Sequence, residues 1–150
     1  MKGKIVGGSV AAVLALAAVL IAPWEGLRTD PYFDLVGVKT VCYGETNVEM
    51  RRYTPAECEA MLARSVEKYV KGVAKCIHRP LAVNQWAAIG SWTYNVGERA
   101  ACNSTLVRQI NAGAPASVWC GQLLRWNRAG GREVRGLTNR RKAEYEVCVQ

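Results

Sequence analysis

Two carboxylates and one hydroxyl near the start of the chain could cleave a glycosidic bond. Asp34 follows Glu25 by nine residues, and Thr40 follows Asp34 by six. Such cleavage needs an acid that protonates the leaving oxygen and a carboxylate that acts as base or nucleophile. Glu25 lies beside Trp24 in an apolar setting that should keep it protonated, whereas Asp34 precedes a glycine turn and should stay ionised. The pattern predicts an acid, a base and a hydroxyl that orients water, although the spacing alone also arises by chance.

The rest of the sequence excludes several other classes of enzyme. His78 is the only histidine and the cysteines lack the spacing of zinc ligands, so we expect no metal and no cofactor. Neither a Gly-x-Ser-x-Gly elbow nor a phosphate-binding loop occurs. A Cys–His peptidase would need a free thiol such as Cys42 beside His78, and an oxidising compartment disfavours free thiols. Carboxylates are the groups that remain for catalysis.

An apolar stretch over residues 5–22 precedes the first carboxylate. Lys2 and Lys4 lie before it and Pro23-Trp24 after it. As a helix it would be about 27 Å long, barely the thickness of a hydrocarbon core, and its many Ala and Gly residues make it a weak anchor that could leave the bilayer. The leading lysines favour a cytoplasmic N-terminus with the remainder exported. Two alternatives remain open: a signal peptide cleaved at Ala15-Leu16-Ala17, and a buried core helix.

Composition agrees with export. Six cysteines in 150 residues indicate three disulfides and an oxidising compartment. We therefore predict a signal anchor over residues 1–22 and one catalytic domain over residues 23–150. The net charge is +8, and the segment from Arg125 to Lys142 contains seven basic residues with Glu133 as its single acid. This face either attracts an anionic cell envelope or is simply a solvated helix face, and export argues against a nucleic-acid partner.

The predicted fold class is α+β, with a mostly helical body and a small β-hairpin subdomain. Turn-forming and β-branched residues alternate over Asp30–Val48, which is typical of a hairpin. Thr54-Pro55-Ala56-Glu57 predicts a capped helix start, and an apolar stripe continues that helix to about Ile77. Further helices are predicted at Asn84–Tyr94, Ser104–Asn111, Pro115–Trp126 and Thr138–Val149.

From Pro23 to the C-terminus the sequence contains several ordered blocks: Glu25-Gly26-Leu27, Tyr32-x-Asp34, Gly37-Val38-x-Thr40, Gly44-x-Thr46, Tyr94-Asn95-Val96-Gly97, Ser104-Thr105-Leu106 and Arg140-Arg141 with Glu144. In this order, the blocks resemble the T4-type phage lysozymes, glycoside hydrolase family 24. With its apolar N-terminus, the whole chain resembles the signal-anchor-release endolysins of phages that infect Gram-negative bacteria.

The resemblance implies a lysozyme-like fold and a monomeric muramidase that hydrolyses the β-1,4 bond from N-acetylmuramic acid to N-acetylglucosamine in peptidoglycan. It implies Glu25 as general acid, Asp34 as the base that activates water and Thr40 as its partner. Substrate-binding residues would be Asn95 and Tyr94 in the glycan cleft, with Arg140 or Arg141 near the acid.

The resemblance also implies a route to the substrate. The host Sec machinery would export the chain, residues 5–22 would hold it in the host inner membrane facing the periplasm, and a holin or pinholin would trigger release into the periplasm. Two alternatives stay open: a non-catalytic anchored protein that binds the cell envelope, and a lytic transglycosylase in the same fold.

Two positions depart from the family pattern. Cys42 stands where Gly is usual, and Glu45 stands where His is common. Glu45 is either a solvated turn residue or a third carboxylate that acts on the acid–base pair, and the sequence does not choose between them. The family layout implies the disulfides Cys42–Cys58, Cys76–Cys102 and Cys120–Cys148.

Overall fold

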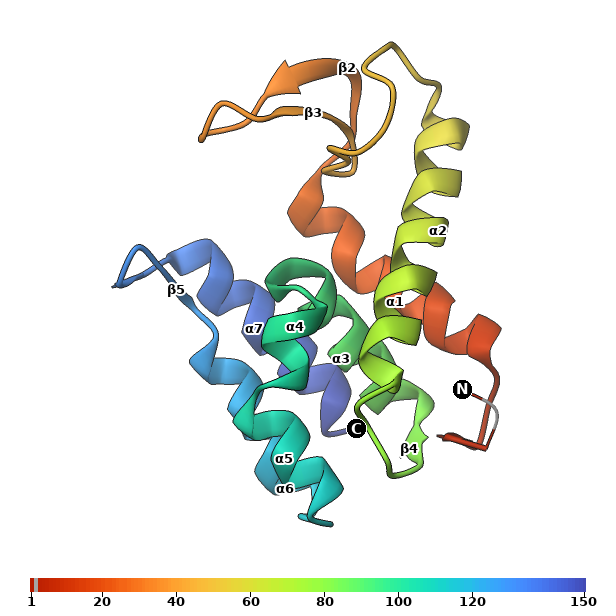
Figure 1. The fold of residues 1–150 in the computed structure, drawn as a ribbon, viewed down its shortest axis with the longest axis vertical. Helices are drawn as coiled ribbons and strands as arrows, with labels where there is room; N and C mark the ends of the chain where they lie inside the picture. Colours follow the sequence, from red (N-terminus) through yellow and green to blue (C-terminus); the bar gives the residue numbers. More distant parts are fainter. Residues whose placement is uncertain (2) are drawn as a thin grey trace.

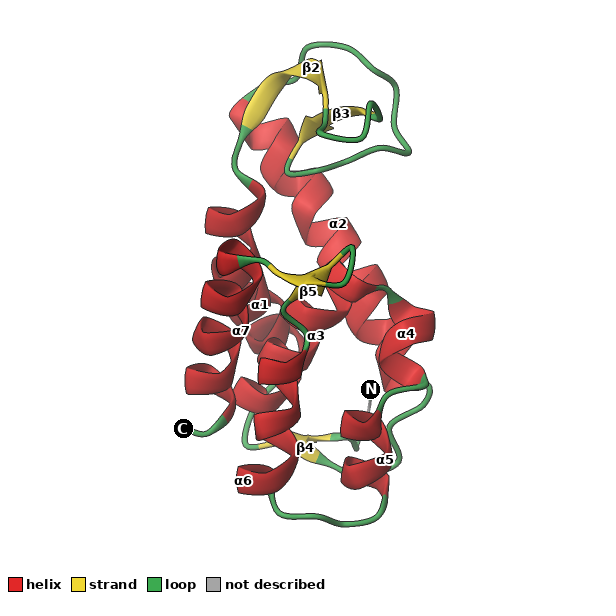
Figure 2. Cartoon of the chain, turned by 90° about the vertical axis from the view of Figure 1, so that its left-hand side faces the viewer, coloured by secondary structure: helices red, strands yellow, loops and turns green. Residues whose placement is uncertain are grey.

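A helical body carries a small β-hairpin at one end of the molecule (Figures 1 and 2). The computed structural model describes Met1 and residues 3–150. The mostly helical body and the small hairpin confirm the predicted α+β class. The helices are α1 (Val10–Glu25), α2 (Pro55–Ala74), α3 (Val83–Val96), α4 (Glu98–Cys102), α5 (Thr105–Asn111), α6 (Ala116–Trp119), the 3-10 helix η1 (Cys120–Arg125) and α7 (Arg135–Cys148).

Within the part of the chain that the structure describes, three two-stranded sheets complete the fold. β2 (Arg28–Phe33) and β3 (Lys39–Cys42) form the predicted antiparallel hairpin. β5 (Arg128–Ala129) and β6 (Arg132–Glu133) form a second antiparallel hairpin, which projects from the helices and which the sequence did not predict. β1 (Ile5–Val6) pairs in parallel with β4 (Leu81–Ala82), so the N-terminal segment is attached to the start of α3.

α2 joins the hairpin to the helical body. Thr54 caps its first turn, since its side chain accepts from the backbone N–H of Glu57 while the Glu57 carboxylate accepts from the N–H of Thr54. The helix ends at Ala74, three residues before the predicted Ile77. Its buried side chains lie on one face and pack against α3 and α1, as the apolar stripe predicts.

α3 is the central helix, and α1, α2 and α7 pack around it. Trp86, Ile89 and Trp92 are fully buried along it. Gly90 permits the close approach of α2, because a Cβ at this position would lie 2.6 Å from the Cγ2 atom of Val70. This packing makes α3 the rigid support for the residues at its C-terminal end.

α1 contains most of the apolar stretch and packs in the core. Val13, Ala17 and Ile21 are fully buried, while Val19 on the opposite face is 69% exposed. The helix continues through Pro23, across the predicted boundary between anchor and domain, and ends at Glu25. Among the residues that the structure describes, no helix combines the length and the apolar character that crossing a bilayer requires.

The segment before α1 makes specific contacts with the body. The carbonyl oxygen of Lys4 accepts from the backbone N–H of Leu81 at 2.8 Å and from the indole Nε1 of Trp86 at 2.7 Å. The Lys4 ammonium donates to the carbonyl of Ala74 at 2.6 Å, at the end of α2 where a positive charge is favourable. These contacts position the start of α1, and no motif in the sequence predicted them.

Three disulfides join elements that are distant in sequence. The pairs are those that the family resemblance implied: Cys42–Cys58, Cys76–Cys102 and Cys120–Cys148. The first ties the end of β3 to α2, and the last ties η1 to the end of α7. A disulfide that closes a loop of this kind typically stabilises the folded domain by about 2–4 kcal/mol.

Candidate active site

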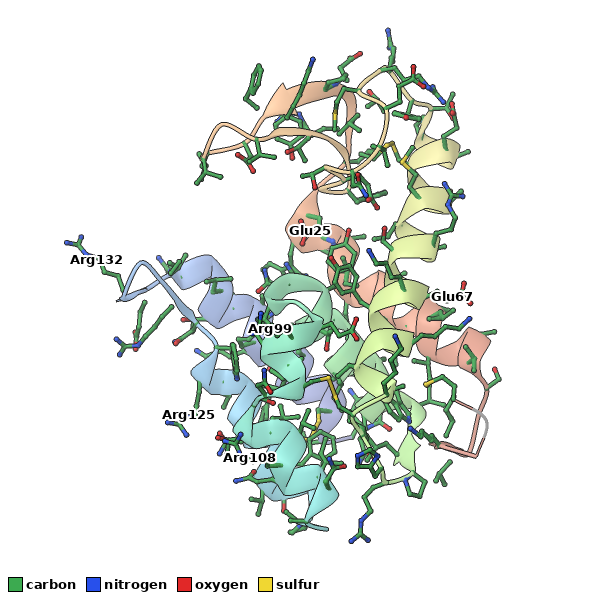
Figure 3. All side chains as sticks on the ribbon, viewed as in Figure 1. Glu25, Glu67, Arg99, Arg108, Arg125 and Arg132 are labelled. Carbon is green, nitrogen blue, oxygen red and sulfur yellow. A yellow bond between two sulfur atoms is a disulfide. The ribbon has the colours of Figure 1, made fainter. Side chains whose placement is uncertain are left out.

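Glu25 lies at the junction between the β-hairpin and the helical body (Figure 3). It is the last residue of α1, and Gly26, with a φ of 70°, then turns the chain into β2. Its Oε1 atom accepts a hydrogen bond from Nη1 of Arg140 at 2.9 Å, and Arg140 is 4% exposed. The apolar setting predicted from Trp24 is therefore wrong, because the decisive neighbour of Glu25 is a buried guanidinium from α7.

A cavity of about 290 Å³ opens beside Glu25, close to the lower end of the roughly 300–1,000 Å³ usual for small-molecule sites. Gly44 brings the backbone against the acid, because a Cβ there would lie 2.8 Å from Oε2 of Glu25. Two carboxylates, two phenol rings and one ammonium group line the cavity. Its lining residues are Glu25, Gly44, Glu45, Thr46, Asn47, Ser65, Lys68, Tyr69, Tyr94 and Asn95.

Asp34 and Thr40 lie in the β2–β3 hairpin, and neither lines this cavity. Oδ1 of Asp34 accepts from the backbone N–H groups of Val36 at 3.0 Å and Val38 at 2.8 Å, which fixes the turn. Thr40 is buried, and its hydroxyl donates to the carbonyl of Val38 at 2.9 Å. Since Thr40 pairs with Tyr32 across the hairpin, the same turn positions both predicted residues, and each keeps acceptor capacity for water.

Arg140 and Arg141 have different partners. Arg140 is the arginine that contacts Glu25, whereas Arg141 donates to Oδ1 of Asn95 at 2.9 Å and pairs with the buried carboxylate of Glu144. Asn95 lines the cavity, so Arg141 holds a cleft residue rather than the acid. The resemblance left open which of the two arginines lies near Glu25, and the structure shows that it is Arg140.

Tyr94 connects the helical body to the hairpin side of the cavity. Its hydroxyl donates to the carbonyl of Tyr43 at 2.9 Å, and its ring lies 5.2 Å from that of Tyr69. Burial raises the pKa of the Tyr94 phenol, and the negative charges of Glu45 and Glu25 raise it further. The Tyr94 side chain is therefore neutral, and its hydroxyl donates a hydrogen bond to the backbone at the edge of the cavity.

Glu144 and the two arginines form a buried charged cluster beneath the site. Burial raises the pKa of Glu144 from 4.5 to about 7, despite the opposing charges of Arg141 and Arg140. The folded state therefore binds the proton of Glu144 more tightly than the unfolded chain does. The stability that this proton binding contributes is fully present below about pH 4.5 and is lost as the pH rises through about 7. The sequence analysis did not predict that Glu144 is the buried partner of the two arginines. The spacing could have indicated it, because Glu144 follows Arg141 by three residues, about one helical turn.

We expect the free energy of unfolding to fall by roughly 1–3 kcal/mol between pH 5.5 and pH 8. Urea titrations at the two pH values measure it. Glu144→Gln should flatten this dependence, whereas Glu146→Gln, an exposed change on the same helix, should preserve it. Equal stability of the wild-type protein at both pH values would contradict the assignment.

The remaining basic residues of the C-terminal third lie at the surface. Arg108, Arg125 and Arg132 are exposed and point outward on one side of the helical body (Figure 3). Within the described part of the chain, none of them forms an ion pair with a carboxylate. Within the segment from Arg125 to Lys142, the predicted basic face therefore includes the exposed Arg125 and Arg132 but not Arg140 and Arg141, which are buried.

The family model for phage lysozyme matches residues 22–144 of this sequence. The chain belongs to the phage lysozyme family. It is 35% identical over 158 aligned positions to a SAR-endolysin of Bacteriophage PS119, covering 99% of this chain and 94% of the relative. It is 37% identical over 145 positions to the SAR-endolysin of Enterobacteria phage P21, covering 91% and 87%.

Solved structures agree with this assignment. An endolysin from the Escherichia coli O157:H7 phage FAHEc1 superposes with a TM-score of 0.79 at 30% identity, covering 93% of this chain and 91% of that one. The chain is thus a phage endolysin with a lysozyme-like fold, and its activity is that of a glycoside hydrolase. The resemblance read from the motifs is confirmed.

Proposed function

We propose that this chain hydrolyses the β-1,4 bond between N-acetylmuramic acid and N-acetylglucosamine in peptidoglycan and thereby lyses the host cell. The observation that carries the proposal is Glu25 at the edge of a sugar-sized cavity, held by a buried arginine. Glu25 protonates the leaving oxygen, Asp34 activates water from the hairpin side, and Thr40 orients that water. The ion pair with Arg140 fixes the acid and stabilises the carboxylate after it has given up its proton.

Digestion of purified peptidoglycan, followed by analysis of the product sugars, tests the proposal. A hydrolase leaves reducing ends at N-acetylmuramic acid. Anhydro-sugar ends would instead indicate a lytic transglycosylase, and unchanged peptidoglycan would indicate a protein that only binds the envelope. Either of these two results would overturn the proposal.

We further propose that the Sec machinery exports the chain and that residues 1–22 tether it to the inner membrane until a holin or pinholin triggers release. The surface of α1 supports this proposal. Ala11, Ala12, Ala15 and Val19 are exposed, so even the solvent-facing side of this helix is apolar. An ordinary surface helix carries polar residues on that side. An all-apolar helix can instead exchange between a bilayer and one face of the core.

The exposed face of α1 allows the tether to be changed without disturbing the core. Ala11→Leu with Ala15→Leu should raise the membrane-bound fraction and delay lysis, whereas Ala15→Lys should prevent tethering, because a lysine at the centre of a spanning helix costs about 2.5–3.5 kcal/mol. Gly8 is a poor site for such changes, because a Cβ there would lie 2.3 Å from Val83. Membrane fractionation and lysis timing provide the measurement, and identical fractions for both variants would refute the tether.

A further inference from the structure

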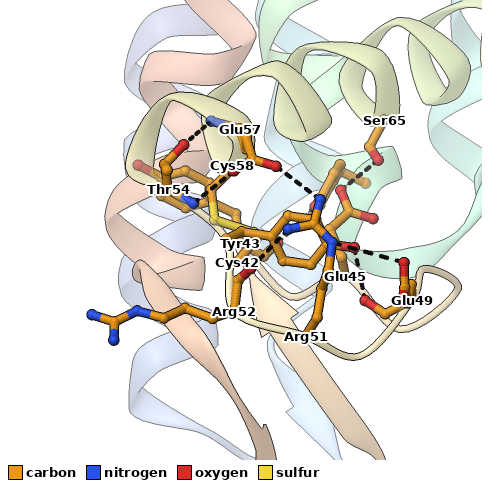
Figure 4. The surroundings of a disulfide bond; sticks show 12 residues. Cys42, Tyr43, Glu45, Glu49, Arg51, Arg52, Thr54, Glu57, Cys58 and Ser65 are labelled. Carbon is orange, nitrogen blue, oxygen red and sulfur yellow. Dashed lines mark hydrogen bonds and ion pairs between the residues drawn. A yellow bond between two sulfur atoms is a disulfide. The ribbon is translucent and has the colours of Figure 1, made fainter.

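The cavity beside Glu25 contains a second carboxylate that the proposed mechanism does not use. Glu45 is half-buried and lines this cavity. Its Oε1 atom accepts a hydrogen bond from the hydroxyl of Ser65 at 2.6 Å (Figure 4). Among the described residues, Oε2 has no hydrogen-bond partner. Since an ionised carboxylate offers about four acceptor positions, Glu45 has acceptor capacity left for a ligand.

The support of Glu45 is rigid. Its backbone exchanges two hydrogen bonds with Val41, at 3.0 and 2.9 Å. The adjacent Cys42 is linked to Cys58 on α2, and Ser65 follows Cys58 by seven residues, which is two helical turns along the same face. The same helix therefore anchors the turn and holds the carboxylate. Little conformational freedom would be lost when a ligand binds there, which favours affinity.

The charges around Glu45 differ from those around Glu25. Glu25 is neutralised by Arg140, whereas Glu45 forms no ion pair among the described residues. Lys68 also lines the cavity and adds a donor to its rim. Both carboxylates line the same cavity as Tyr94, and their negative charges raise the pKa of the Tyr94 phenol. An acceptor next to a donor suits uncharged groups that carry hydroxyls and amides.

We propose that Glu45, positioned by Ser65, is a saccharide-binding residue that accepts a hydrogen bond from a hydroxyl or amide N–H of the sugar next to the bond cleaved at Glu25. The inference rests on the proposed function, since it places an N-acetylated sugar in this cavity. It replaces the interpretation of Glu45 as a solvated turn residue. The position where the family commonly has histidine thus becomes a contact with the glycan.

Binding measured without turnover gives the sharpest test. In a Glu25→Gln background, calorimetry with peptide-free glycan strands of peptidoglycan should show that Glu45→Gln raises the Kd about tenfold, because hydrogen bonds to charged groups are the stronger ones. Ser65→Ala should raise the Kd by a smaller factor, about threefold, since it frees the carboxylate to move. Glu49→Gln is the matched control, because Glu49 is an exposed glutamate four residues away that faces Arg51 (Figure 4). Its Kd should stay within about twofold.

Kinetics with the acid intact separate a binding role from a structural one. Glu45→Gln should raise KM more than it lowers kcat, because a contact made in both ground state and transition state contributes uniform binding. A lower Tm with an unchanged Kd would overturn the inference and leave the proposed function standing. If the wild-type protein releases no fragments from peptidoglycan, the proposed function fails and the inference fails with it.

Discussion

Replacing Glu25 with glutamine should reduce the rate of peptidoglycan hydrolysis by about 10³-fold, because a positioned general acid contributes roughly 10²–10⁴. The amide keeps the shape of the side chain and an oxygen that can accept from Arg140, so the fold should persist. Turbidity loss of purified peptidoglycan measures the rate, and circular dichroism checks the fold.

Glu67→Gln is the matched control for this change. Glu67 lies on the opposite side of the molecule from the basic face and pairs with Lys71 at 2.6 Å on the surface of α2 (Figure 3). The control should retain full activity. A general acid contributes at least about 10²-fold to the rate. If the Glu25 variant kept more than about a tenth of the wild-type rate, the loss would be smaller than this, and Glu25 would not be the general acid.

Replacing Ile21 with alanine should lower the free energy of unfolding by about 2–4 kcal/mol, because Ile21 is fully buried and the change leaves a cavity. Val19→Ala, two residues earlier but 69% exposed, should cost less than about 0.5 kcal/mol. Urea unfolding with the disulfides intact measures both.

The comparison shows whether the apolar segment is part of the core of the released protein. If the two substitutions had equal effects, α1 would not pack as the structure shows. The result also bears on the alternative of a cleaved signal peptide. Cleavage after Ala17 would remove Val13 and Ala17 from the core, both of which are fully buried.

Local signals in the sequence were sufficient for several elements. The capping sequence at Thr54 located the start of α2, and the turn residues between Asp30 and Val48 located the hairpin. A periodic apolar stripe predicts which face of a helix is buried. α1 is apolar on every side, so its sequence indicates a helix without indicating which residues enter the core.

The surroundings of Glu25 could not be read from its neighbours in sequence. Trp24 suggested an apolar pocket, but Arg140 comes from 115 residues away and determines the charge next to the acid. The same limit applies to Glu45, whose partner Ser65 lies 20 residues further along the chain. The contacts of Lys4 with Ala74 and Trp86 span 70 and 82 residues and left no local pattern.

The anomeric form of the first product tests the central claim most directly. If Asp34 activates water against a bond protonated by Glu25, hydrolysis inverts the anomeric carbon, and proton NMR of the earliest product should show the α-anomer before mutarotation. A β-anomer formed first would mean that a carboxylate had attacked the sugar directly. That result would contradict the proposed roles of Glu25 as acid, Asp34 as base and Thr40 as the residue that orients water.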